Sequence, residues 1–194
     1  MGRKRIRDIR NEELIEATIV AVHQYGYATV TMTEIAREAG TTAASISYYF
    51  GSKDGLMEAT MRYLLQKLKA AVVTGYTQAK SPIDRFYAIL DANFDDSLFT
   101  VEQCSLWVQF WASAPYQPRL ARIQEINRQR VRSHFRAELK HLVPETEVDV
   151  VRRALQSYMD GVWLQATQSE GALNAAAARA EARRVADLLL GRSA

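Results

Sequence analysis

Aromatic side chains recur beside carboxylates at helical spacing in three segments of the sequence. Trp107, Phe110 and Trp111 share one face of a predicted helix, because residues three and four apart are neighbours on a helix surface. A carboxylate among buried aromatic rings is costly unless it meets a cation, and aromatic faces attract quaternary ammonium ions. The pattern therefore predicts a site for a choline-like cation, with ordinary helix packing as the alternative for each aromatic taken alone. The residues predicted to form this site are Asp91, Phe94, Asp95, Trp107, Phe110, Trp111, Tyr158 and Trp163, with Asp160 between the last two.

No combination of residues predicts catalysis. The histidines, His23, His134 and His141, lack the spacing of a zinc site, and the sequence contains no nucleophile elbow and no phosphate-binding glycine loop. Cys104 is the only cysteine, so an intrachain disulfide or a cysteine-based zinc site cannot form, and we expect a small buried hydrophobe there. The sequence therefore predicts no enzymatic activity, no metal and no cofactor.

The elements that must hold these side chains are helices. Only four prolines and nine glycines interrupt 194 residues, and apolar residues recur at intervals of three and four, which predicts an all-α fold of about nine helices. Capping residues, prolines and glycines indicate where the helices end. The predicted helices are 11–25, one from Thr31 to Gly40, one from Thr42 to Gly51, a long one from Ser52, one from Ser81, one that reaches Ala114, one from Pro118 to before Pro144, 147–169 and 174–190.

Two of these helices are short and form a helix-turn-helix motif. They are joined by residues 40–42 and braced by the helix over 11–25, and their inner residues Ile35 and Ile46 are predicted to pack together. The outward face of residues 43–50 carries small and hydroxyl-bearing side chains, where a solvated helix would normally carry Lys and Glu. Such side chains let a helix enter the major groove of DNA, where Ser bonds base edges and Tyr bonds phosphates.

Two basic features flank this motif. Lys53 stands at the start of the fourth helix, where its charge and the free amides of the helix start could hold one phosphate. Residues 1–10 contain five basic side chains and one acid, although the net charge of the whole chain is only +3. This concentration of charge predicts an arm that contacts DNA phosphates, with a solvated tail as the alternative.

Residues 31–40 (TMTEIAREAG) and 45–56 (SISYYFGSKDGL) strongly resemble the DNA-binding head of the TetR family of transcriptional regulators. The resemblance implies an N-terminal three-helix head over 1–53 that binds operator DNA. It also implies a C-terminal helical body over 54–194 that encloses a ligand and dimerises through its last two long helices. By the same resemblance, the residues that contact DNA are Thr31, Thr33, Thr42, Ser45, Ser47, Tyr48, Tyr49 and Lys53.

Segments spread over the chain, 50–62, 107–118 and 160–164, are similar to the choline-sensing repressors of glycine betaine synthesis within this family. The similarity implies repression of choline uptake and glycine betaine synthesis genes, with release from the operator when choline binds. Apolar residues in the last two helices exceed what one small body needs, which is consistent with a homodimer. A TetR-family regulator that responds to another cation or to a hydrophobic drug is the alternative, and the acids beside the aromatic rings argue against a neutral drug.

The general features of the chain predict its location. No stretch approaches the roughly 20 unbroken apolar residues of a membrane-spanning helix, and acidic residues follow the basic N-terminus where a signal peptide would be apolar. We therefore expect a cytoplasmic protein with no membrane partner. Residues 119–140 carry seven basic side chains against two acids. A solvated helix face is the expected explanation for this segment, and a second nucleic-acid surface is the alternative.

Overall fold

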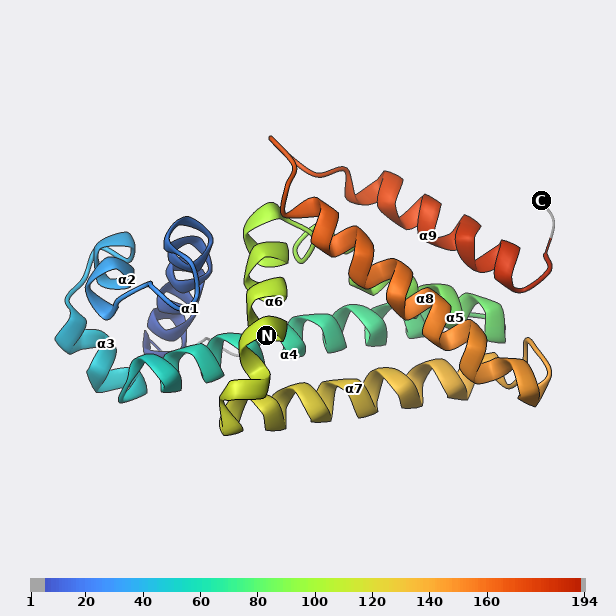
Figure 1. Cartoon of the computed structure of the whole chain (residues 1–194), viewed down its shortest axis with the longest axis horizontal. Coiled ribbons are helices and arrows are strands. Elements are labelled where there is room, and N and C mark those ends of the chain that lie inside the picture. Colours follow the sequence, from blue (N-terminus) through green and yellow to red (C-terminus); the bar gives the residue numbers. More distant parts are fainter. Residues whose placement is uncertain (1–5, 193–194) are drawn as a thin grey trace.

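Residues 6–192 are described by the computed structural model (Figure 1). Within them the chain has nine α-helices, one short 3-10 helix and no strand, so the predicted all-α fold is confirmed. No helix in this part of the chain is long and apolar enough to cross a membrane. The elements are α1 (Ile6–Tyr25), α2 (Met32–Glu38), α3 (Ala43–Phe50), α4 (Lys53–Gln78), α5 (Pro82–Asn93), α6 (Val101–Ser113), η1 (Ala114–Tyr116), α7 (Pro118–Leu139), α8 (Glu145–Ala166) and α9 (Ala175–Leu189).

The starts of the two short helices are fixed by the capping residues that the sequence predicts. The Thr31 hydroxyl accepts a hydrogen bond from the Glu34 amide (3.2 Å), and the Glu34 carboxylate accepts one from the Thr31 amide (2.7 Å), so α2 begins with a capping box. Thr42 caps α3 by accepting a hydrogen bond from the Ser45 amide at 3.1 Å. Gly40 lies between the two helices with a φ of 59°, a left-handed conformation that costs glycine little, and it turns the chain toward α3.

Two long helices begin earlier than predicted. α1 begins at Ile6, within the basic N-terminal segment, where Arg10 and Glu13 form an ion pair of 2.8 Å along the helix. α8 begins at Glu145, directly after Pro144, whose restricted backbone suits the position before a helix, and it ends before the predicted residue 169. These differences change the helix bounds and leave the order of elements as predicted.

The head is closed by α1, α2, α3 and the first turns of α4. Leu14 of α1, Ile35 of α2 and Ile46 of α3 are fully buried, as the sequence predicts for the inward faces of the two short helices. Leu56 of α4 is also fully buried and completes this part of the core. α4 then continues into the body over a total of 26 residues, so the predicted boundary at residue 53 falls at the start of one continuous helix.

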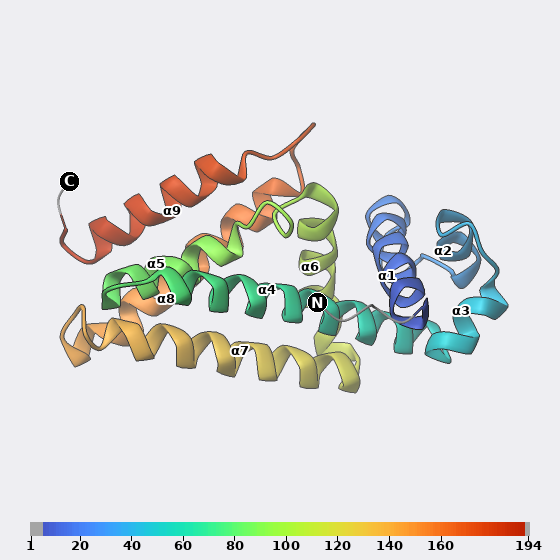
Figure 2. The same cartoon turned by 180° about the vertical axis from the view of Figure 1, so that it is seen from behind.

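The body is a bundle in which α4, α5, α7 and α8 run roughly along the long axis of the molecule (Figures 1 and 2). α6 crosses that direction and packs against α1 of the head on one side and against α8 on the other. Aromatic side chains fill the core, and the rings of Phe86 and Phe135 meet edge to face with their centres 5.8 Å apart. Because α6 packs against both α1 and α8, it is a helix through which the body contacts the head.

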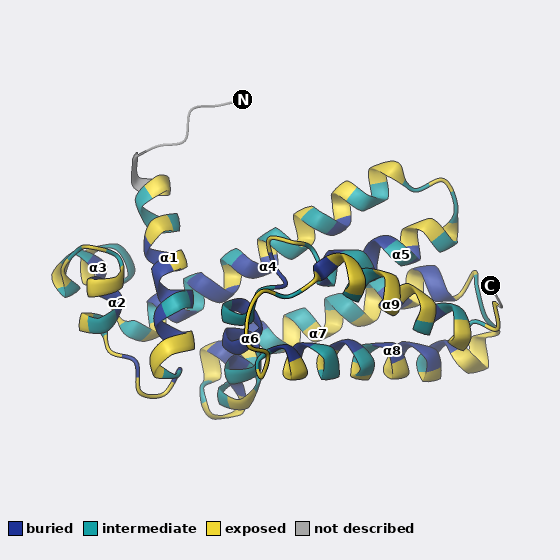
Figure 3. Cartoon of the chain, turned by 90° about the horizontal axis from the view of Figure 1, so that it is seen from above, coloured by how far each residue is buried: buried dark blue, intermediate teal, exposed yellow. Residues whose placement is uncertain are grey.

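α9 lies on the outside of the body against α5 and α8, and most of its surface is exposed (Figure 3). Many apolar residues of α8 that suggested a subunit interface, such as Val148, Leu155 and Met159, are buried within this chain instead. The exposed apolar face of the last two helices is therefore smaller than the sequence pattern indicates. Its large exposed side chains are Val150, Leu164, Leu188 and Leu189.

Candidate DNA interface and ligand cavity

The residues predicted to contact DNA lie together at one end of the molecule, on α2, α3 and the start of α4 (Figure 1). Tyr48 of α3 is 83% exposed, and Ser47 beside it is also exposed. Tyr49 is half-buried and packs edge to face against Tyr48, with the ring centres 5.3 Å apart. The surface of α3 therefore combines hydroxyl groups with a pair of packed aromatic rings, and it contains no acid.

Two threonine hydroxyls of the predicted DNA-binding set already serve the helices that they cap. Thr31 Oγ1 accepts a hydrogen bond from the Glu34 amide and donates one to the Glu34 carboxylate at 2.9 Å. Thr42 Oγ1 accepts a hydrogen bond from an amide of α3. Thr33 is exposed and Ser45 is half-buried at the same end of the molecule. Direct DNA contact by any of these side chains stays a prediction.

Lys53 reaches back from the start of α4 to the segment that precedes α2. Its Nζ donates a hydrogen bond to the Ala28 carbonyl at 3.2 Å. Partial burial lowers the pKa of the Lys53 ammonium group, and the charges of Asp54 and Glu34 partly oppose this effect. Because an ammonium group has three donors, Lys53 can hold this segment and still bind a DNA phosphate.

The other basic segments give less support to a DNA interface. Residues 1–5 of the predicted phosphate-binding arm lie outside the described residues. On α7, Arg136 donates hydrogen bonds to Glu145 (2.6 Å) and Asp149 (2.9 Å), so part of the basic charge of that helix is balanced within the body. These ion pairs favour the solvated face that we expected for α7 over a second nucleic-acid surface.

A cavity of about 250 Å³ lies within the body, between α4, α5, α6, α7 and α8. Trp107 and Trp111 of α6 and Trp163 of α8 line one part of it. The three indole rings lie 6.0, 6.2 and 6.4 Å apart between centres, so they converge on one part of the wall. We call this arrangement the tryptophan corner. The polar residues of the cavity wall are Asn93, Gln124, Asn127, Arg128, Gln156 and Asp160.

Asp160 supplies the acid of the cavity wall. Asp160 is an exposed residue, but the surrounding protein removes part of its hydration and raises the pKa of its carboxyl group to about 6, while Arg128 partly opposes this shift. Among the described residues no cation lies within 4.0 Å of the Asp160 carboxylate. Trp107 Nε1 and Gln124 Oε1 are also buried without a hydrogen-bond partner in the described part of the chain. The cavity therefore offers a carboxylate to a molecule that enters it, and two unpaired polar atoms lie buried in side chains of its wall.

Three of the eight residues that the sequence predicts for the ligand site line this cavity, namely the members of the tryptophan corner. Phe110 lies behind that corner, fully buried, with its ring edge to face against Trp107 and 5.7 Å away. Phe94 is also fully buried and packs against Phe99. These two phenylalanines therefore support the fold around the cavity and do not form its wall.

The remaining predicted residues lie elsewhere. The Asp91 carboxylate accepts hydrogen bonds from Arg183 of α9. Asp95 accepts hydrogen bonds from the amide and hydroxyl of Ser97 at 2.9 and 2.7 Å. For Tyr158, burial and the nearby Glu181 carboxylate raise the pKa of the phenol to about 12. The structure thus places Asp91, Asp95 and Tyr158 outside the cavity wall.

Sequence reasoning missed the polar wall that α7 contributes. Gln124, Asn127, Arg128 and Val131 follow the three-and-four spacing of one helix face, so a signal for a shared surface was present. On an isolated sequence that face is indistinguishable from a solvated one, because its residues are mostly polar. The sequence places Asp160 beside the aromatic residues of α8, but only the structure shows that it shares a cavity with the tryptophans.

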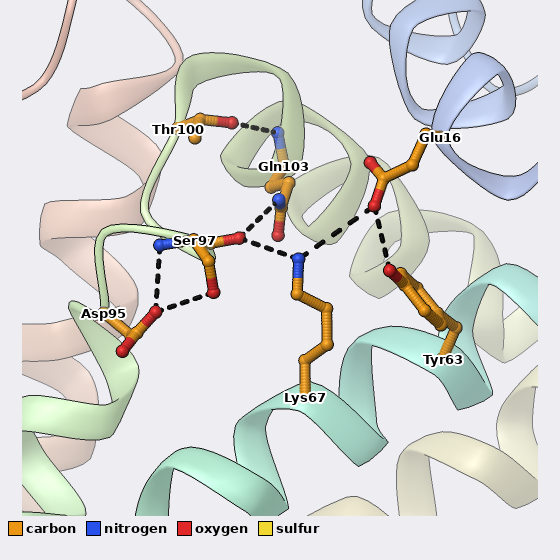
Figure 4. A network of polar contacts seen from close by, with 7 residues as sticks. All are labelled: Glu16, Tyr63, Lys67, Asp95, Ser97, Thr100 and Gln103. Carbon is orange, nitrogen blue, oxygen red and sulfur yellow. Dashed lines mark hydrogen bonds and ion pairs between the residues drawn. The ribbon is translucent and has the colours of Figure 1, made fainter. Parts of the chain in front are cut away.

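A network of polar contacts joins the head to the body through α4 (Figure 4). Tyr63 of α4 donates a hydrogen bond to Glu16 of α1 at 3.1 Å, and Lys67 lies 4.0 Å from the same carboxylate. Lys67 also donates to the Ser97 carbonyl at 3.1 Å, which accepts a second hydrogen bond from Gln103 of α6 at 2.8 Å. Lys67 therefore links α1 of the head to the segment before α6.

Gln109 provides a second connection between α6 and the head. Its side-chain oxygen accepts a hydrogen bond from the Tyr27 amide at 2.6 Å, and its nitrogen donates to the Ser105 hydroxyl at 3.0 Å. Trp107 and Trp111 lie on the same helix and line the cavity. α6 thus carries cavity residues and a head contact within a few residues of each other.

Comparison with known proteins identifies relatives over nearly the whole chain. Residues 14–60 match the family described as bacterial regulatory proteins, tetR family, and residues 82–191 match the family described as BetI-type transcriptional repressor, C-terminal. The HTH-type transcriptional regulator BetI of Ectopseudomonas mendocina is 38% identical over 190 residues, which cover 97% of each chain. The regulator of the same name from Serratia proteamaculans is 39% identical, covering 89% of this chain and 88% of its own.

Solved structures share the fold at lower sequence identity. A transcriptional regulator from Saccharomonospora viridis, solved in complex with choline, superposes with a TM-score of 0.71 at 19% identity, covering 91% of this chain and 95% of its own. Regulators of this family bind operator DNA and small-molecule effectors and form dimers. The chain therefore belongs to the TetR family of bacterial transcriptional regulators, and its C-terminal domain is that of the BetI-type repressors.

Proposed function

We propose that the chain represses genes for choline uptake and glycine betaine synthesis and that choline releases it from its operator. The observation that carries this proposal is the tryptophan corner with the unpaired Asp160 carboxylate in the same cavity. The structural relative that was solved with choline supports the same ligand. The protein then acts by binding alone, without catalysis, and it works in the cytoplasm, where its operator is.

The chemistry of the cavity favours a quaternary ammonium over a primary one. A trimethylammonium group has no N–H donors, so it can leave water and rest against aromatic faces without losing hydrogen bonds. The Asp160 carboxylate supplies the opposite charge once it is ionised, above a pH of about 6. Ethanolamine carries an ammonium group that must keep its hydrogen bonds, and the faces of the indole rings cannot accept them as well as water does.

The hydroxyl of choline also finds partners in this proposal. Gln124 Oε1 can accept from it and Trp107 Nε1 can donate to it once these side chains turn toward the cavity, since both atoms are buried and unpaired among the described residues. Satisfying a buried polar group removes a cost that the protein bears without ligand. The hydroxyl therefore adds affinity and orients the cation in the tryptophan corner.

Operator binding requires two copies of the chain. We propose that α8 and α9 pair with those of a second copy through Val150, Leu164, Leu188 and Leu189, which are large, apolar and exposed. The two α3 helices must then match half-sites about one helical turn of DNA apart, or a multiple of it. Choline binding to α6 and α8 favours a dimer in which the heads no longer fit that spacing.

Titration of intrinsic fluorescence tests the ligand directly. The chain has three tryptophans and all three line the cavity, so the signal reports on this site alone. We expect saturable, choline-selective quenching, a much weaker response to ethanolamine, and release of labelled operator DNA over the same choline range. Trp111→Ala should weaken choline binding about thirtyfold, since a desolvated cation–π contact contributes about 2 kcal/mol. Equal responses to the two amines, or none, would remove choline as the effector.

Gln109→Leu should separate ligand binding from operator release. The substitution removes the hydrogen bonds to the Tyr27 amide and to Ser105 without altering the cavity wall. We expect the choline Kd to stay within about twofold, while the choline concentration that releases the operator rises roughly two- to thirtyfold, the range of typical coupling energies. Calorimetry gives the first value and fluorescence anisotropy of labelled operator gives the second.

The matched control is Gln78→Leu, because Gln78 is exposed and lies at the end of α4. This variant should leave both values unchanged. If Gln109→Leu shifts the Kd and the release concentration by the same factor, Gln109 affects binding and plays no part in transmission to the head.

A further inference from the structure

The side of the cavity formed by α7 and α8 adjoins a second hollow of about 200 Å³. Arg128 and Gln156 line both spaces, so they stand between them. The second hollow is also lined by Arg132 and Arg152, and by Glu125, which is its one acid in the described part of the chain. Three guanidinium groups therefore surround a space next to the cation site.

Two of these arginines are available to a ligand. Arg152 is buried and already donates to Asp149 (3.2 Å) and Gln156 (3.1 Å). Arg128 and Arg132 are exposed, and within the described residues no carboxylate lies within 4.0 Å of either guanidinium group. An arginine without an acidic partner at the wall of a ligand cavity is suited to bind a carboxylate or phosphate in a bidentate manner.

The two sides of the cavity carry charges of opposite sign. Asp160 and the tryptophan corner favour a cation, and Arg128 lies close enough for its charge to act on Asp160 without forming an ion pair with it. A molecule with one charge of each sign can thus satisfy both groups, with its ammonium toward Asp160 and its anion toward Arg128. The cavity and the adjoining hollow together allow a ligand that is longer than a small cation.

We propose that this site also binds zwitterions in which a quaternary ammonium is joined to a carboxylate or a phosphate, with Arg128 holding the anionic group. The proposal rests on the cation site described above and extends its ligand class. Arg128 is then a specificity-determining residue: it favours zwitterions over choline, because it attracts their anionic group and repels the net positive charge of choline. The repressor would in that case respond to more than one compound of this class.

The test compares three probes, choline, glycine betaine and phosphocholine, by calorimetry against the full-length protein and two variants. Arg128→Gln should raise the Kd of the zwitterions about tenfold or more, since a charge-assisted pair is lost, and should leave the Kd of choline unchanged or lower. Arg122→Gln, at an exposed arginine of α7 that lines neither space, should change none of the three. The tighter of the two zwitterions identifies the anionic group that the site prefers.

Three results would overturn the proposal. A wild-type protein that binds choline and neither zwitterion has a cation site alone, and the proposed effector stands. Equal losses for all three probes in Arg128→Gln would show that Arg128 supports the cavity without recognising an anion. Absence of binding by all three probes would overturn this inference together with choline as the effector.

Discussion

Asp160→Asn should weaken choline binding roughly tenfold to a hundredfold at neutral pH and at the same time make the ligand-free protein more resistant to heat. A charge at 4 Å contributes about 1 kcal/mol in water and about 4 kcal/mol near a protein surface, or about fivefold and nearly a thousandfold in Kd, and the expected loss lies between these limits. Stability changes in the opposite direction, because the protein around Asp160 disfavours its ionised form and raises its pKa to about 6. Asparagine removes that cost.

The same substitution should remove a pH dependence. The pKa of Asp160 is raised on folding from an ordinary value of 3.8 to about 6, so its contribution favours the folded state at low pH and is lost as the pH rises through about 6. Choline binding follows the opposite course: the affinity of the wild-type protein falls as the pH drops below about 6, by at most about tenfold per pH unit. The asparagine variant should show a flat profile.

Calorimetry at several pH values and thermal unfolding of the ligand-free protein measure the two effects. Glu147→Gln is the matched control, because Glu147 is an exposed acid on the same helix and does not line the cavity. It should change neither the Kd nor its pH dependence. An asparagine variant at residue 160 that binds choline as tightly as the wild type would show that this carboxylate does not face the bound cation.

Tyr48→Ala should weaken operator binding about a hundredfold or more without destabilising the head. A hydrogen bond to a charged phosphate contributes about 1.5–3 kcal/mol, and the symmetric dimer loses two such contacts. Tyr48 is 83% exposed, so its ring adds little to the core, although it packs against Tyr49. Fluorescence anisotropy at fixed salt, with an operator selected from random duplexes by the wild-type protein, gives the change in Kd.

Tyr116→Ala provides the control, because Tyr116 is 86% exposed and belongs to the short helix between α6 and α7 in the body. This variant loses the same kind of side chain as Tyr48→Ala, but at a site away from α3. Because Tyr116 is a surface residue that we do not expect to contact a DNA phosphate, the Kd of this variant for the operator should stay within about twofold of the wild-type value. A Tyr48 variant that binds operator like this control would exclude Tyr48 from the DNA interface.

The head could be predicted from the sequence in detail because its determinants are local. Thr31 and Glu34 are three residues apart and fix the start of α2 by themselves, and Gly40 marks the turn that follows. The inward residues Ile35 and Ile46 follow from helical spacing over short distances. Each of these features acts within one or two helical turns, so a single sequence contains the information needed to place them.

The cavity could be predicted only in part because its walls come from five helices. Trp107 and Trp111 are neighbours on one helix, and their spacing revealed them. Asp91 has the same kind of spacing beside aromatic residues, but its partner is Arg183, which lies 92 positions further along the chain. Nothing in local periodicity states how one helix is rotated against another, and that rotation decides whether a carboxylate meets a ligand or an arginine of its own chain.

The continuity of α4 determines where such regulators can exchange parts during evolution or in the laboratory. Leu56 and Met57 lie in the body's first helix by position, yet they are fully buried in the first turns of α4, the helix that packs against α1 and α3 of the head. A chimera joined at residue 53 would take these two side chains from the wrong parent, and its new head would meet an unfamiliar surface. Recombination that preserves a working repressor must cross over further along α4, so a new operator specificity is inherited together with the first turns of the helix that leads to the effector site.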